Sequence, residues 1–391
     1  MMTTEKLEAL AASLPTPSYV FDSDLFAQRA GLVREAFGEK CGLCFSIKAN
    51  PFLLGCLPEV FDKIEVCSPG ELTICEKVGA DMSMVIFSGV NKTAKDVERA
   101  MADNVGTFTA ESMLHVQLIN DSALRHGKKV PVLLRLTGGS QFGMDETELL
   151  SIIENRADYP GMEIVGIHYF TGTQKRKVAL IEKELKLVEA FVDKVETEYG
   201  FRLSRVEYGT GLAVDYFAED ADEKEAERLN AVAPAIRALA EKVELTVEMG
   251  RFFAAPCGFH FTKVMDAKTC MDVNYAILDG GLNMLKYDGQ IQGMQIPAIT
   301  HIGKTEAEPE KWTLCGSLCT TADILARNAE FSGLKIGDTL VFHRTGAYSV
   351  MEGMAVFLSR EMPTVALYSE KDDLRIVRKQ IDTDVFNTPS F

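Results

Sequence analysis

The chain has 391 residues, of which 47% are hydrophobic and 25% charged, with 41 lysines and arginines against 57 aspartates and glutamates. This composition is typical of a packed globular protein and excludes a disordered or fibrous one. The formal net charge of −16 opposes binding to nucleic acid, because an acidic surface repels a polyanion. The length suits two domains, or one large barrel with an appendage.

Cellular location and redox state follow from what the sequence lacks. It has no run of about 18 apolar residues, and MMTTEKLEALAASL has no signal-peptide core, so we expect a cytoplasmic protein without a membrane partner. The cysteine count of nine is odd, which favours reduced thiols over a disulfide framework. Cys41 and Cys44 have zinc spacing, but no second pair completes a site, and we predict no metal.

Short apolar runs alternate with helix-like stretches between residues 40 and 250. The strand-like runs include CGLCFSI, KIEVCS, SMVIFSG, VPVLLRL, MEIVGIHYF, LSRVEYGTG and VELTVEMG. Helix-like stretches such as PFLLGCLPEVFD, PGELTICEKVGA and KTAKDVERAMAD separate the first of them. This α/β pattern, with roughly eight strands, predicts a closed (β/α)8 barrel of the TIM type over residues 26–255.

The pattern changes after about residue 255, where runs such as GFHFTKVMDA, VNYAILDG, TLVFHR and TVALYS are bounded by Gly, Asp and Pro. We therefore predict a second, mostly β domain formed by residues 1–25 and 256–391. No long Pro- or Ser-rich linker separates it from the barrel.

Lys48 in FSIKANP follows a strand-like run, at the place where a barrel strand delivers its last side chain into the mouth. Desolvation there favours an uncharged amine that can form an imine, although position alone allows a solvent-exposed lysine equally well. Gly209 and Gly211, in YGTG, allow backbone N–H groups to approach a phosphate, but such a pair can also form a plain turn. Glu248 and Arg251, in EMGR, end another strand and suit either a site or a structural ion pair.

Three further positions stand in contexts that could be functional. Cys315 and Cys319 precede a helix-like run in LCGSLCTTADIL, where a helix N-terminus would activate a thiol. Tyr348 lies in a Gly-flanked turn, GAY, and each of these residues taken alone is more easily structural. His168 is the one histidine at a strand end, and no hydrolase triad or HExxH pattern is present.

Taken in order, six motifs resemble the alanine-racemase-fold (fold type III) PLP-dependent decarboxylases, the ornithine, diaminopimelate and arginine decarboxylase family. They are FSIKANP, VCSPGEL, GIHYFTGTQ, YGTG, EMGR, and the pair CGSLCTTAD with GAY, and they span nearly the whole chain. The resemblance implies pyridoxal 5'-phosphate as cofactor and a homodimer with shared active sites. It also implies a β-rich domain that completes those sites.

The resemblance assigns roles to individual residues. Lys48 would carry PLP as a Schiff base, and Glu248 would pair with the ring nitrogen. Cys319 would be the second catalytic residue, which protonates the substrate carbon from the other subunit. The other cofactor-binding positions would be Glu65 and Ser68 (with Glu71 beside them), Phe170, Thr173, Gly209, Gly211, Gly250, Arg251 and Tyr348.

Departures from the family pattern concern the substrate. Phe170 stands where the family has a cofactor-stacking histidine, and a phenyl ring can stack but cannot donate a hydrogen bond. Thr320 replaces an acidic residue that helps to hold the distal amine of the substrate in the diaminopimelate and ornithine enzymes. Asp288 and Asp323 are further substrate candidates.

Three functions remain open at this point. The leading one is decarboxylation of a basic amino acid or a conjugated amino-acid derivative, which releases CO2 and leaves an amine. An amino-acid racemase on the same fold is the alternative, disfavoured because the match is to Cys319 and its flanking residues. A noncatalytic PLP-binding or regulatory protein is the third, disfavoured because Lys48, Glu248 and Arg251 are all present.

Overall fold

The computed structural model describes residues 2–390 and divides into two compact units. One unit comprises residues 29–214 and 223–252, and the other comprises residues 1–28, 215–222 and 253–391. The chain passes from one to the other four times, within helices α2 (Ser23–Phe37), α8 (Ala221–Ala240) and α9 (Arg251–Ala254) and in the loop at Val214 and Asp215.

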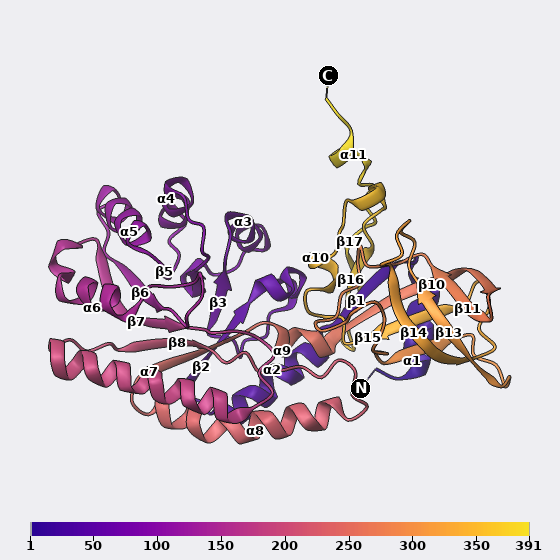
Figure 1. Cartoon of the computed structure of the whole chain (residues 1–391). Coiled ribbons are helices and arrows are strands. Elements are labelled where there is room, and N and C mark those ends of the chain that lie inside the picture. Colours follow the sequence, from indigo (N-terminus) through magenta and orange to yellow (C-terminus); the bar gives the residue numbers. More distant parts are fainter. Residues whose placement is uncertain (1, 391) are drawn as a thin grey trace. The chain divides into compact units, whose positions relative to one another are not determined.

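The first unit is a closed barrel of eight parallel strands in sequential order, β2 to β9. Figure 1 shows helices α3 to α8 ranged around these strands. The strands are β2 (Cys41–Ser46), β3 (Lys63–Val66), β4 (Val85–Phe87), β5 (Thr107–Ala110), β6 (Val130–Leu136), β7 (Met162–Tyr169), β8 (Arg205–Gly209) and β9 (Glu244–Met249). The predicted (β/α)8 barrel is thereby confirmed.

The helices of the barrel begin and end at residues suited to those positions. Thr93 caps α4 with a capping box to Asp96, and Ser112 caps α5, while Gly79 ends α3 in the left-handed conformation at φ 73°. The helices are α3 (Pro69–Val78), α4 (Ala94–Ala102), α5 (Met113–Arg125), α6 (Glu146–Glu154) and α7 (Val178–Tyr199), with short turns η1 (Ile47–Ala49), η2 (Pro51–Cys56), η3 (Met82–Met84) and η4 (Arg156–Asp158).

The second unit is built on a nine-stranded sheet, which confirms the expectation of a mostly β part. Its strands are β1 (Ser18–Asp22), β10 (Gly258–Cys270), β11 (Val273–Leu278), β12 (Ile299–Ile302), β13 (Pro309–Cys315), β14 (Ile324–Ser332), β15 (Thr339–His343), β16 (Thr364–Ser369) and β17 (Asp373–Arg378). Its helical segments are α1 (Thr4–Ser13), η5 (Ala255–Cys257), α10 (Ser349–Glu352), η6 (Phe357–Ser359) and α11 (Asp384–Asn387). Leu7 and Leu10 of α1 pack with Val20, Phe261 and Val341 in its core.

Two local expectations were wrong. The helix-like stretch PFLLGCLPEVFD forms only the short turn η2, because Pro58 cannot continue a helix and forces the preceding residue into an extended conformation. The apolar stretch after Cys319 is strand β14 and not a helix, since its pairing with β13 overrides the helical pattern. Cys319 therefore does not lie at a helix N-terminus.

The described residues contain neither a disulfide nor a membrane-spanning helix. All nine cysteines are free thiols. Among residues 2–390, no helix is both long and apolar enough to cross a membrane.

Candidate active site

Lys48 lies in η1, immediately after β2, at the carboxyl end of the barrel strands. Its Nζ atom donates to Glu65 Oε2 at 2.7 Å and lies 3.4 Å from Glu248 Oε1 and 3.5 Å from Cys67 Sγ. The side chain is 37% exposed, whereas those of the two carboxylates are buried. An accessible amine held between buried carboxylates is suited to react with a carbonyl compound.

Glu248 is the penultimate residue of β9, and both of its carboxylate oxygens have hydrogen-bond partners. Ser46 Oγ donates to Oε1 at 2.8 Å, and His168 Nε2 lies 3.0 Å from Oε2. Burial raises the pKa of Glu248, but Lys48 and His168 outweigh that effect and hold the pKa well below its usual value. Glu248 is therefore a fixed negative charge inside the barrel.

Glu65 and the turn that follows β3 support Lys48 from the adjacent strand. Glu65 is 2% exposed and accepts a hydrogen bond from Cys67 Sγ at 3.2 Å. Ser68 Oγ accepts from the backbone N–H of Glu71 at 3.1 Å, and Glu71 Oε2 accepts from that of Cys67 at 2.6 Å. Ser68 and Glu71 thus hold the first turn of α3 and, through it, the position of Cys67.

Glycines allow the loops after β7 and β8 to lie against each other. A Cβ atom on Gly209 would lie 2.4 Å from the Phe170 ring, and one on Gly211, whose φ is +60°, would lie 2.0 Å from the Gly172 carbonyl oxygen. The backbone N–H of Lys175 donates to Gly211 at 2.8 Å. Close packing of this kind excludes any side chain at Gly209 or Gly211.

Three further predicted positions complete the barrel part of the site. A Cβ atom on Gly250 would lie 2.7 Å from Ala49 Cβ, so the end of β9 packs directly against η1. Arg251 is the first residue of α9, directly after this glycine. Thr173 is exposed in the loop after β7.

The other predicted residues belong to the β-rich unit. Cys319, Thr320 and Asp323 share the loop between β13 and β14, where Cys319 is exposed and borders an open groove of about 820 Å³. Asp323 is buried and accepts the backbone N–H groups of Leu282 and Leu318, so it holds its loop in place. Two residues lie elsewhere in this unit, Asp288 half-buried after β11 and Tyr348 with a left-handed φ of 66° before α10.

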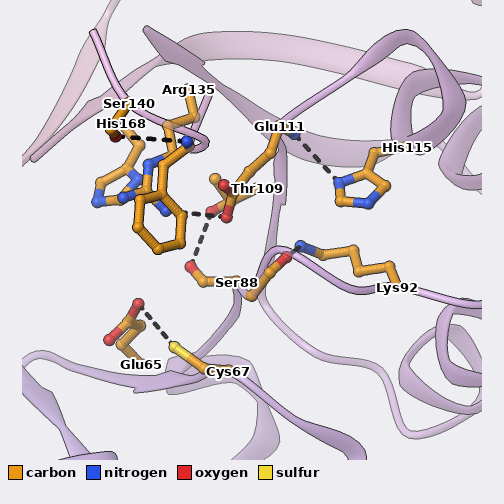
Figure 2. Close-up of polar contacts among 12 residues, drawn as sticks. Glu65, Cys67, Ser88, Lys92, Thr109, Glu111, His115, Arg135, Ser140 and His168 are labelled. Carbon is orange, nitrogen blue, oxygen red and sulfur yellow. Dashed lines mark hydrogen bonds and ion pairs between the residues drawn. The ribbon is translucent and has the colours of Figure 1, made fainter. Parts of the chain in front are cut away.

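A second polar cluster, which sequence reasoning missed, lies at the carboxyl ends of β4, β5 and β6 (Figure 2). Arg135 Nη1 donates to Glu111 Oε1 at 2.9 Å, and His115 Nδ1 accepts the backbone N–H of Glu111. Lys92 Nζ donates to the carbonyl of Gly89 at 2.5 Å. Lys92 follows the strand-like run SMVIFSG, so its position carried a signal similar to that of Lys48, whereas Glu111 follows β5, which was not recognised from the sequence.

Four neighbours of Lys48 were not assigned roles from the sequence, namely Ser46, Cys67, His168 and Glu207. Ser46 is the last residue of β2, two positions before Lys48, and Glu207 lies on the same face of β8 as Gly209; these positions are the signal that could have revealed them. Glu207 is 1% exposed, and a hydrogen bond with Cys44 offsets its burial only in part. Burial, followed by the charges of Glu248 and Glu65, raises its pKa well above the usual value.

The barrel and this cluster define a class of enzyme in which a lysine amine works beside a fixed carboxylate. These residues fit PLP. The amine can bind its aldehyde, and Glu248, whose pKa is low, can bind its cationic ring nitrogen. The turn that contains Gly209 and Gly211 can bind its phosphate. Among residues 2–390, no three His, Cys, Asp or Glu side chains form a group that could hold a metal ion.

Comparison with known proteins identifies the family. Residues 24–255 match the family described as pyridoxal-dependent decarboxylase, pyridoxal binding domain. Diaminopimelate decarboxylase of Aquifex aeolicus is 27% identical, over 98% of this chain and 94% of that protein. L-glutamyl-[BtrI acyl-carrier protein] decarboxylase of Niallia circulans is 24% identical, over 97% and 94%. The structure of Helicobacter pylori diaminopimelate decarboxylase with L-lysine superposes with a TM-score of 0.84, at 25% identity over 97% of this chain and 98% of that one.

The chain therefore belongs to the fold type III PLP-dependent decarboxylases, the family of the ornithine, diaminopimelate and arginine decarboxylases. It is a PLP-dependent amino-acid decarboxylase, and its substrates are of the amino-acid class. The predicted fold, cofactor and reaction are confirmed by these comparisons and by the barrel.

Proposed function

We propose that Lys48 holds PLP and that the enzyme decarboxylates a basic amino acid or a conjugated amino-acid derivative. The observation that carries this assignment is the Lys48 amine, which lies between Glu65 and Glu248 at the mouth of the barrel. PLP, when bound, supplies an electron-accepting ring that stabilises the negative charge left as CO2 departs. Glu248, as a carboxylate, would favour the protonated ring nitrogen and so strengthen that effect.

The remaining predicted residues complete this assignment. The phosphate of PLP would be bound by Gly209, Gly211, Gly250, Arg251 and Tyr348. Phe170 would cover one face of the PLP ring. The Cys319 thiol would give its proton to the substrate α-carbon. The barrel, residues 26–255, would be the PLP-binding domain, and residues 1–25 and 256–391 would complete the active site of a cytoplasmic homodimer. The exposed position of Cys319 supports a role toward another subunit.

Two substrate classes have separate support. A basic amino acid is favoured by the similarity to the Aquifex aeolicus diaminopimelate decarboxylase and to the Helicobacter pylori enzyme that binds L-lysine. A conjugated amino acid is favoured by Thr320, which offers no negative charge to a distal amine, and by the similarity to the Niallia circulans enzyme, whose substrate is carrier-bound glutamate. Asp288, Thr320 and Asp323 would be the residues that distinguish the two.

The test is CO2 release by the PLP-loaded protein. The panel contains D- and L-lysine, ornithine, arginine, diaminopimelate and amide-conjugated amino acids, with Lys48→Ala as control. Release that depends on Lys48 names the substrate class. Inversion of the α-carbon without CO2 release would contradict decarboxylation and indicate a racemase. Bound PLP with no turnover of any compound would favour a noncatalytic role.

A further inference from the structure

His168 makes a contact for which neither the motifs nor the proposed reaction accounts. It lies on β7 with 1% of its surface exposed, and its Nε2 atom lies 3.0 Å from Glu248 Oε2 on β9. Strand β8 runs between these two strands, and the β8 residue in register with Glu248 is Gly209. The imidazole therefore reaches across β8, where His168 is in register with Glu207, to a carboxylate one strand further on.

The hydrogen bonds of His168 indicate which nitrogen carries the proton. Its Nδ1 atom is buried and has no hydrogen-bond partner. A doubly protonated ring would bury an unsatisfied, charged N–H at this position, which is more costly than a bare ring nitrogen. The geometry therefore favours the neutral ring with its proton on Nε2, donated to Glu248.

Ser46 acts on the other oxygen of the same carboxylate. Its Oγ atom donates to Glu248 Oε1 at 2.8 Å, so two uncharged donors, Ser46 and His168, hold the two oxygens. Uncharged donors fix the plane of a carboxylate and leave its full negative charge to act on another group. Lys48 of η1, Glu65 of β3 and the carboxyl of Glu207 from β8 also surround Glu248, and Arg135 of β6 and Glu207 of β8 are the residues in register with His168.

We propose that His168 is a positioning residue which, as a neutral imidazole, presents the Glu248 carboxylate to the ring nitrogen of PLP. The inference rests on the proposed placement of PLP at Lys48 and Glu248, and not on which substrate is decarboxylated. Phe170, at the family's histidine position, offers no hydrogen-bond donor, whereas His168, two residues earlier, lies within hydrogen-bond distance of Glu248.

The experiment compares two substitutions in the full-length protein, with PLP affinity and the visible absorption of bound PLP as readouts. His168→Leu removes the donor, and we expect PLP to bind about 10- to 100-fold more weakly, as when other outer-shell partners are lost. His168→Gln keeps an uncharged N–H at a similar reach. It should restore PLP affinity to within about threefold of the wild type, with the same pH midpoint in the absorption spectrum. Ser46→Ala, which removes the donor to the other oxygen, should weaken binding in the same direction.

Each outcome decides the proposal. Loss in His168→Leu with recovery in His168→Gln supports a neutral donor. Equal loss in both variants, or a shifted pH midpoint in His168→Gln, overturns it, because the imidazole would then act through its charge or shape. Unchanged affinity in both also overturns it. If His168→Leu does not fold, as judged by thermal melting, the pH midpoint of His168→Gln still tests the proposal: an unchanged midpoint supports it and a shifted one overturns it. Because PLP binding is read without substrate, a wrong substrate class leaves these outcomes unaffected, and a protein that binds no PLP refutes the proposed function first.

Discussion

Two polar clusters at the carboxyl ends of the barrel strands use similar residues in opposite ways. The Lys48 cluster consists of Ser46, Lys48, Glu65, His168 and Glu248, and the Arg135 cluster of Lys92, Glu111, His115 and Arg135. The Lys48 side chain is 37% exposed and contacts two carboxylates, whereas Lys92 is 3% exposed and donates to a backbone carbonyl.

The two clusters differ in whether their charged side chains are accessible to another molecule. In the Arg135 cluster the guanidinium is paired with Glu111 and lies 4.7 Å from the Phe142 ring, and Lys92 lies 5.5 Å from the Phe87 ring. These contacts bind β4, β5 and β6 to their loops, as expected of a structural network. In the Lys48 cluster the carboxylates converge on one accessible amine. A charged residue at a strand end is thus a reactive candidate when its neighbours leave it exposed, and a structural one when they enclose it.

The largest effect separating the clusters should come from Lys48→Ala. Activity should fall by about three orders of magnitude or more, because the amine proposed to hold the cofactor is lost. The melting temperature of the PLP-free protein should also fall, because the buried Glu65 and Glu248 lose the amine that offsets their charge. Steady-state CO2 release and thermal melting measure the two quantities. Retained activity would show that Lys48 is not the reactive lysine.

Glu111→Ala should affect stability most. It leaves the buried guanidinium of Arg135 without its carboxylate, and breaking a buried pair costs about 3–5 kcal/mol. Denaturant unfolding measures this cost. Glu98→Ala, which breaks the exposed pair with Arg125, is the matched control and should cost less than about 1 kcal/mol. Equal losses in the two variants would contradict a structural role for the Arg135 cluster.

Glu248→Gln tests the charge within the Lys48 cluster. We expect kcat to fall about 100-fold, because a neutral amide cannot stabilise the protonated ring nitrogen as a carboxylate does. Glu65→Gln serves as the comparison, since Glu65 also contacts Lys48, and it should be less damaging to kcat. The assignment of Glu248 to the ring nitrogen would fail if both variants lost the same activity.

The smallest effect should be a pH dependence caused by Lys92. Burial lowers the pKa of this lysine to about 8, against an ordinary value of 10.5. Between these values the unfolded chain binds more protons than the folded one, so stability rises with pH. Relative to Lys92→Met, the wild type should gain about 2 kcal/mol between pH 7 and 10, measured by denaturant unfolding. The exposed Lys95→Met control should show no such slope, and a flat difference for Lys92 would contradict the shift.

The alternation of apolar runs and helical stretches was enough to predict the barrel and the β-rich part, because strands buried on both faces must be apolar. The prediction was wrong locally where strand pairing overrode a helix-like sequence pattern, as in β14, which pairs with β13. β5 was not recognised as a run, because two of its four residues, Thr107 and Thr109, are polar. Lys48 and Glu248 could be singled out because each lies in a distinctive motif at the end of a strand.

The sequence by itself determined the fold class and the family and singled out Lys48 as the candidate reactive lysine, since these depend on periodicity and on ordered motifs that are local in the chain. Only the tertiary structure decided which side chains act together. His168 and Glu248 are 80 residues apart in sequence, yet closure of the barrel brings them to 3.0 Å. Lys48 and Lys92 both follow strand-like runs, and their different burial depends on neighbours from other strands. No local pattern records such neighbours, because they are set by strand order and register.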